Sequence, residues 1–239
     1  MSNSDNGTGF RAFHPRPVRW APLNSTVLLR SIGAGLGVAL ALYACSQAVA
    51  EFVRPAFRTA DFFTNAKPAP DSGALAAALS FDSGILSDSA ANKAKLALAT
   101  APSDQADRKE VNRDAQSAVR SALSASPVNS ALWLMLGLLE SSVDQPSAAA
   151  LKMSYLTGRL PPEAMATRIR ALITTPAAVD EEIKILAQSD LRALLSRGPS
   201  YETALTTAYR QATPEGRKFL LDTADSINPR FATSLRRSD

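Results

Sequence analysis

The chain has 239 residues, of which 46 % are hydrophobic and 20 % charged, as is typical of a folded protein. One Cys and one His exclude an internal disulfide, a Cys-rich zinc site and a multi-His metal centre. Aromatic residues make up only 6 % and Ala and Leu are frequent, which favours helices over a β-sandwich or barrel. We therefore expect an all-α protein with no metal and no cofactor.

The net charge of +4 is concentrated at the N-terminus. Residues 1–30 carry four arginines against one aspartate, so the other 209 residues carry only +1. A nucleic-acid-binding domain gathers Lys and Arg on a folded face. Here the excess precedes an apolar run, which indicates membrane topology, and we expect no nucleic-acid partner.

The first predicted element is a transmembrane helix at residues 25–54. Its centre, residues 31–50, contains no charged side chain and would span about 30 Å as a helix, which matches the hydrocarbon core of a bilayer. By the positive-inside rule, residues 1–24 form a disordered cytoplasmic tail and the rest of the chain lies outside the cytoplasm. Compact length, Ala-rich composition and the short basic tail favour a bacterial inner-membrane protein with a periplasmic domain.

Two other interpretations of this segment stay open. Ala48-Val49-Ala50 matches a signal-peptidase site, so the chain could be secreted after cleavage following Ala50. Cys45 ends a sequence that resembles a bacterial lipobox, although Tyr43 departs from that pattern. Gly33 and Gly37 form a G-x-x-x-G spacing, which could support weak self-association of the helix.

Residues 55–72 are expected to be a linker, rich in Pro and Phe. Its Phe side chains could rest at the bilayer interface or dock on the domain that follows. Beyond it the apolar spacing is helical, with caps expected at Ser87 or Asp88, Asn129 and Asp180, and with Asn228-Pro229 expected to end the last helix. No alternating β-run bounded by turn residues occurs.

A 34-residue period is present in the centre of the chain. Pro127 and Pro161 are 34 residues apart, as are Ala115 and Ala149. In this register the small, large and proline positions of a helical hairpin are taken by Ala115, Ala122, Pro127, Trp133, Leu136, Gly137, Ala149 and Pro161. Residues 95–161 therefore resemble the tetratricopeptide repeat, with one good unit and a half-matching unit before it.

This resemblance implies an array of helical hairpins over residues 73–161, with Trp133 between the paired helices near residues 115–123 and 147–156. Burial there would make replacement of Trp133 by Ala cost about 3–5 kcal/mol. Glu140 stands where the repeat usually has an aromatic residue, and Thr167 and Ile183 fall at the Trp and Ala positions of a third unit. We therefore expect residues 162–239 to form a non-repeat helical cap.

No catalytic residues are identified. His14 lies in the expected tail, and no nucleotide-binding or nucleophile motif occurs. The resemblance implies a protein–protein interaction scaffold that binds other envelope proteins. The chain is also similar in general character to helical envelope proteins that accompany polysaccharide assembly and export. The alternative is a carboxylate-dependent glycan-processing enzyme, with Glu140, Glu163 or Asp190 as candidate acids.

The orientation can be measured with reporter fusions. A phosphatase that is active only outside the cytoplasm should be active when fused after Asp239 and inactive when fused near Arg19. The reverse pattern would contradict the predicted orientation. A mature chain that begins at Glu51 would replace the anchor with a cleaved signal peptide.

Overall fold

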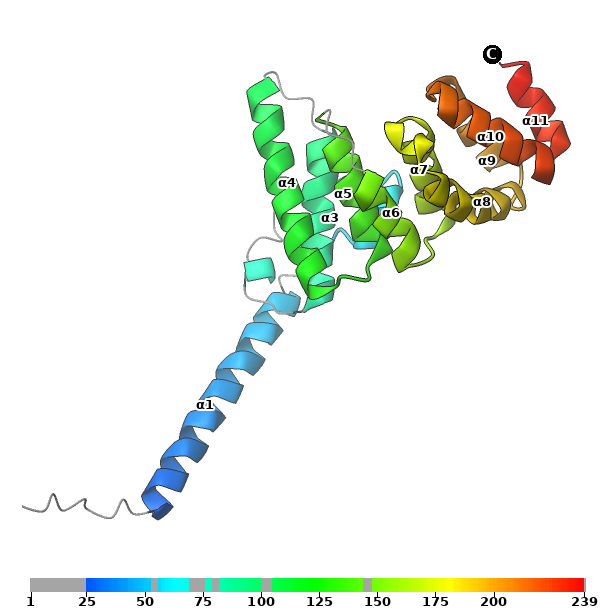
Figure 1. The fold of residues 1–239 in the computed structure, drawn as a ribbon. Helices are drawn as coiled ribbons and strands as arrows, with labels where there is room; N and C mark the ends of the chain where they lie inside the picture. Colours follow the sequence, from blue (N-terminus) through cyan, green and yellow to red (C-terminus); the bar gives the residue numbers. More distant parts are fainter. Residues whose placement is uncertain are drawn as a thin grey trace, which may run out of the picture. The chain divides into compact units, whose positions relative to one another are not determined.

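The computed structural model describes residues 25–52, 56–68, 76–78, 82–99, 105–143 and 148–238. All regular secondary structure in these ranges is helical, which confirms the all-α expectation (Figure 1). The chain divides into two compact units, residues 1–44 and residues 45–239. The expected tail, residues 1–24, lies outside the described residues.

The first helix, α1 (Ser25–Phe52), has the length and apolarity to cross a membrane between Leu28 and Phe52. Its large apolar side chains face outward, because Leu29, Leu36 and Leu42 are 74 %, 61 % and 67 % exposed. An exposed apolar surface of this kind requires a lipid or protein environment. These features fit a membrane anchor and equally a signal sequence.

Two successive helical hairpins follow in the second unit. Helices α3 (Ser83–Ala99) and α4 (Gln105–Ala125) pack as the first pair, and α5 (Ser130–Ser141) and α6 (Ala148–Thr157) as the second (Figure 1). The Asn129 side chain caps α5 as predicted, accepting hydrogen bonds from the Ala131 and Leu132 amides. The cap predicted at Ser87 or Asp88 was wrong: Asp82 caps α3, and both residues lie inside the helix.

The C-terminal part consists of α7 (Pro162–Ile173), η2 (Pro176–Val179), α8 (Glu181–Leu195), α9 (Pro199–Arg210), α10 (Pro214–Ile227) and α11 (Pro229–Arg236). Asp180 caps α8 as expected. Asn228-Pro229 ends α10 but also starts α11, which the sequence analysis missed. The Asn228 side chain accepts a hydrogen bond from the Phe231 amide, and proline fits the first turn because it lacks an N–H.

Two hydrophobic cores hold the second unit together. The N-terminal core lies among α3, α4 and α5, and the C-terminal core lies among α7 to α11 with contributions from α5 and α6. Leu138 of α5 packs against both cores, and so does Phe63, which precedes α3 in the sequence. Helix α5 and the segment that contains Phe63 therefore both join the two halves of the domain.

The structure places the repeat residues in different environments. Ala115, Ala122, Leu136 and Gly137 are buried, and Pro161 immediately precedes α7. Pro127 is exposed in the turn before α5. Ala149 is also exposed, and Ala150 takes the buried position against Gly137 instead, so the expected register is shifted by one residue in α6.

Trp133 is only partly buried, although it packs against the N-terminal core. Its indole Nε1 donates a hydrogen bond to the Pro127 carbonyl oxygen at 2.8 Å. The ring therefore covers the turn between α4 and α5, and the fully buried positions on its helix belong to Leu132, Leu134, Met135 and Leu139. Replacing a fully enclosed aromatic side chain by Ala typically lowers the free energy of unfolding by about 3–5 kcal/mol, and for Trp133 we expect a smaller loss.

Two helical glycines provide a test of this packing. A Cβ on Gly216, at the start of α10, would lie 2.1 Å from the carbonyl oxygen of Ile173. Gly216→Ala should therefore lower the free energy of unfolding by about 1–3 kcal/mol or more through overpacking against main chain. Urea unfolding followed by circular dichroism measures the loss.

Gly137→Ala is the matched control. A Cβ on Gly137 would meet its nearest atoms at 3.6 and 3.7 Å, which is ordinary contact distance. Alanine also gains about 0.8–1 kcal/mol of helix propensity over glycine. Gly137→Ala should be neutral or stabilising, and equal losses in the two variants would refute the α7–α10 packing.

Candidate interaction groove

Residues 56–68, which lie between α1 and α3 in the sequence, form part of the domain. We call residues 56–68 the strap; it includes the short helix η1 (Thr59–Phe63) and contacts α3 and α7 (cyan in Figure 1). Asp88 of α3 holds its beginning. One carboxylate oxygen accepts hydrogen bonds from the Thr59 amide at 2.8 Å and hydroxyl at 3.0 Å, and the other pairs with Arg58 at 3.1 Å.

Lys95 of α3 holds the end of the strap. Its ammonium donates hydrogen bonds to the main-chain carbonyls of Phe62 at 2.7 Å and Thr64 at 2.8 Å, and lies 5.6 Å from the centre of the Phe62 ring. Burial lowers the pKa of Lys95. Asp88 and Lys95 are seven residues apart, which places them two turns apart on one face of α3.

Aromatic side chains anchor the strap between these two polar contacts. Phe57 and Phe62 are only 4 % and 5 % exposed and belong to the N-terminal core. Phe63 packs edge-on against Phe62, with ring centres 4.9 Å apart. Of the two predicted positions for these side chains, the bilayer interface or the domain, the structure shows the domain.

The strap forms one wall of a groove. A hollow of about 480 Å³ is lined by strap residues 62–65, by Lys95 and Leu98 of α3, by Leu138, and by Thr167 and Arg170 of α7. A second hollow of about 240 Å³ shares Leu138 and Arg170 with the first and continues past the end of α7 to Gln211. We call these two hollows together the groove.

The groove has a simple electrostatic character. Among the described residues that line it, only Lys95 and Arg170 are charged, and both are cations. Lys95 is engaged by the strap. Arg170 is exposed, and its guanidinium makes no hydrogen bond or ion pair with any residue in the described part of the chain. The groove therefore presents one cation without a partner beside apolar Leu138.

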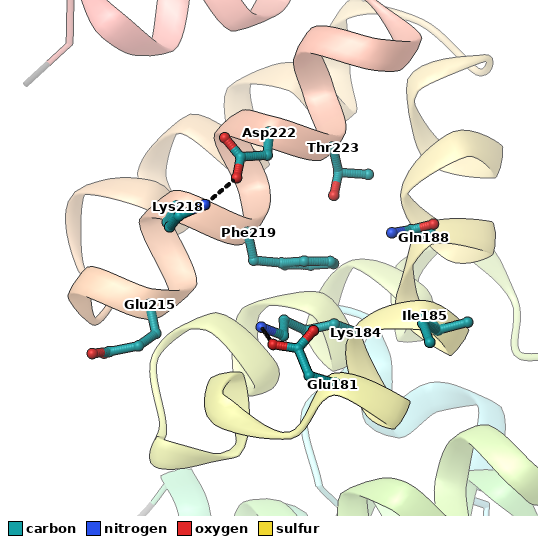
Figure 2. Close-up of a pocket in the computed structure, with 9 residues that line it drawn as sticks. All are labelled: Glu181, Lys184, Ile185, Gln188, Glu215, Lys218, Phe219, Asp222 and Thr223. Atoms are coloured by element: carbon teal, nitrogen blue, oxygen red, sulfur yellow. Dashed lines mark hydrogen bonds and ion pairs between the residues drawn. The ribbon is translucent and has the colours of Figure 1, made fainter.

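A separate pocket of about 380 Å³ lies between α8 and α10 (Figure 2). It contains three carboxylates, those of Glu181, Glu215 and Asp222. Lys184 pairs with Glu181 and Lys218 pairs with Asp222, and the two paired carboxylate side chains are 81 % and 62 % exposed. The hydrogen bond to Asp222 raises the pKa of Lys218. Mixed, solvated charges therefore line this pocket.

The three carboxylates considered as catalytic acids have separate partners. Glu140 pairs with Arg120 of α4 at 2.9 Å, and Glu163 accepts a hydrogen bond from the Tyr201 hydroxyl at 3.2 Å. Asp190 is buried in an ion pair with Arg168, also buried, at 2.6 Å. Arg168 further donates to the Ser154 carbonyl and lies 4.0 Å from the Tyr155 ring, so the Arg168–Asp190 pair joins α6, α7 and α8.

Sequence reasoning missed the residues that build the groove. Asp88 was assigned to a helix cap, and Lys95 and Arg170 were not singled out. The sequence did contain a signal, because Asp88 and Lys95 lie seven residues apart and so share one face of the Ala-rich helix 83–99. The packed face of an amphipathic helix is usually apolar, so charges there indicate a specific contact. Within the described ranges, no cluster of three or more His, Cys, Asp or Glu side chains could hold a metal ion.

Comparisons with protein-family models, with curated proteins and with solved structures gave no match. The resemblance to the tetratricopeptide repeat therefore has no support from any family model.

The contact between Lys95 and the strap can be tested by mutation. Lys95→Met keeps the aliphatic stem but leaves two carbonyls without their donor, which should cost about 1.5–3 kcal/mol of unfolding free energy. Amide hydrogen exchange in residues 58–66 should become faster as the strap loosens. Lys109→Met on the exposed face of α4 is the control and should change neither quantity. Unchanged exchange in Lys95→Met would show that Asp88 and the aromatic side chains hold the strap without Lys95.

Proposed function

We propose that this protein is a membrane-anchored scaffold that binds other envelope proteins through the groove. The single observation that carries the proposal is the open, partly apolar groove between the strap, α5 and α7, where Arg170 has no partner among the described residues. Grooves between packed helices are common sites for partner segments. The hairpin pairs α3–α4 and α5–α6, and the resemblance of residues 95–161 to the tetratricopeptide repeat, support a binding role.

The proposed location is the bacterial inner membrane, with the domain in the periplasm. The basic residues before α1 and the near balance of charge after it support this orientation. The exposed apolar side chains of α1 support retention in a bilayer. The proposal of an accessory role in envelope or polysaccharide assembly follows only from the general character of the sequence.

The competing proposal is a glycan-processing enzyme that uses carboxylates. The carboxylates of the pocket between α8 and α10 are its best candidates, because three of them line one hollow (Figure 2). A general acid of this kind usually needs a carboxyl group that is shielded from water. The high exposure of Glu181 and Asp222 supports the scaffold over this enzyme.

Site-specific photo-crosslinking in native membranes tests the scaffold. A photoreactive amino acid replacing Thr167 in the groove should give protein adducts of defined mass. The same amino acid replacing Arg113, on the exposed face of α4, is the control and should give few. Equal adduct yields at the two positions would count against the groove as the binding surface.

The enzyme is tested separately by charge removal. Glu181→Gln, Asp222→Asn, Glu140→Gln and Glu163→Gln keep side-chain volume while removing charge. The scaffold predicts that each variant supports the same cellular phenotype as the wild-type chain. Loss of the phenotype in one variant that remains folded and abundant would favour catalysis.

A further inference from the structure

The groove also indicates what kind of segment it binds, an inference that rests on the proposed scaffold function. The strap shows how this domain binds a short segment of chain beside the groove. Its aromatic side chains enter the core while a lysine ammonium binds its main-chain carbonyls. The strap ends beside the first hollow, where residues 62–65 form the wall. The rest of the groove, over Leu138 and Arg170, is not covered by any described residue.

Charge decides between the possible occupants. No described carboxylate lines either hollow, while Lys95 and Arg170 both do. Arg170 has no hydrogen-bonding or ionic partner in the described part of the chain, and its planar guanidinium suits bidentate contact with a carboxylate. An acidic occupant would therefore gain an ion pair, whereas a basic one would be repelled.

The apolar part of the lining favours a polypeptide. Leu98, Leu138 and the strap's aromatic residues line the first hollow beside polar Thr167. Ala171 and Leu138 line the second hollow beside Thr174 and Gln211. An extended peptide alternates side chains on its two faces, so apolar groups can enter the hollows while main-chain groups meet the threonine hydroxyls and the glutamine amide.

We propose that the groove binds an extended segment of a partner protein, with an Asp or Glu carboxylate on Arg170 and an apolar side chain over Leu138. Binding falls with rising salt, because the ion pair is close to solvent. The strap stays in place and forms one wall of the binding site.

A peptide selection tests the proposal on the full-length protein in lipid nanodiscs. A displayed library of random twelve-residue peptides is selected against the wild-type chain and, in parallel, against Arg170→Gln. We expect enrichment of Asp and Glu beside apolar residues on the wild type only. A peptide from the selection, synthesised with and without Asn or Gln in place of its acidic residues, should lose at least about tenfold in affinity with the neutral side chains.

Arg192→Gln is the matched control, because Arg192 is an exposed arginine of α8 that lines neither hollow. It should bind the selected peptide like the wild type, and both variants should keep the wild-type unfolding midpoint. Selected peptides without acidic enrichment, equal binding to Arg170→Gln, or no selected peptide at all would each overturn the proposal.

Two further outcomes separate this proposal from others. Stronger binding of polygalacturonate oligomers than of the acidic peptide, dependent on Arg170, would identify an acidic glycan as the occupant and overturn the peptide assignment. The scaffold function itself would be contradicted by a different result, equal photo-crosslinking yields at Thr167 and Arg113. Neutral peptides in the selection, together with Thr167 adducts, would overturn only the acidic character of the partner.

Discussion

The groove depends on the hydrogen bonds between α3 and the strap. Asp88 and Lys95 bind opposite ends of the strap. Asp88 accepts hydrogen bonds from the strap's N–H and O–H groups, and Lys95 donates hydrogen bonds to its carbonyls. Between them, Phe57 and Phe62 complete the N-terminal core. Phe63 also reaches the C-terminal core, so this segment connects both halves of the domain and at the same time forms a wall of the groove. The wall of the groove and the core of the domain therefore share the same residues.

A second polar cluster fixes the other wall. Arg168 of α7 is buried and binds Asp190 of α8 and the Ser154 carbonyl of α6. Burial raises the pKa of Asp190, and the guanidinium opposes that rise. A buried ion pair adds little net stability but is costly to break, since one charge is left without its partner. Arg168 thus holds α7 in place, and Arg170, two residues further, points away from the packed side and stays exposed.

Helices and most caps follow from local sequence signals, and for that reason they were predictable. Asn129 and Asp180 cap helices because their side chains reach the free amides of the first turn.

The same signal gave a wrong prediction at Asp88, because its carboxylate binds Thr59 of the strap, 29 residues away, instead of capping a helix. The prediction at Asn228 was incomplete, because this residue both ends α10 and caps the start of α11. The prediction that Ala149 takes the packed position in α6 was wrong. A shift of one residue leaves the 34-residue period intact but places Ala150 against Gly137. The groove itself depends on contacts between segments far apart in sequence, which periodicity does not encode.

Only a short stretch of chain separates α1 from the buried part of the strap. Five residues lead from Phe52, the last residue of α1, to Phe57, which is buried in the core. Such a stretch reaches at most about 18 Å even when fully extended. If α1 lies in a bilayer, this chain length keeps Phe57 close to the membrane surface, and a molecule that binds the domain would have to approach that surface. Proteins of the same membrane would then meet the domain far more often than proteins that diffuse freely through the adjoining compartment.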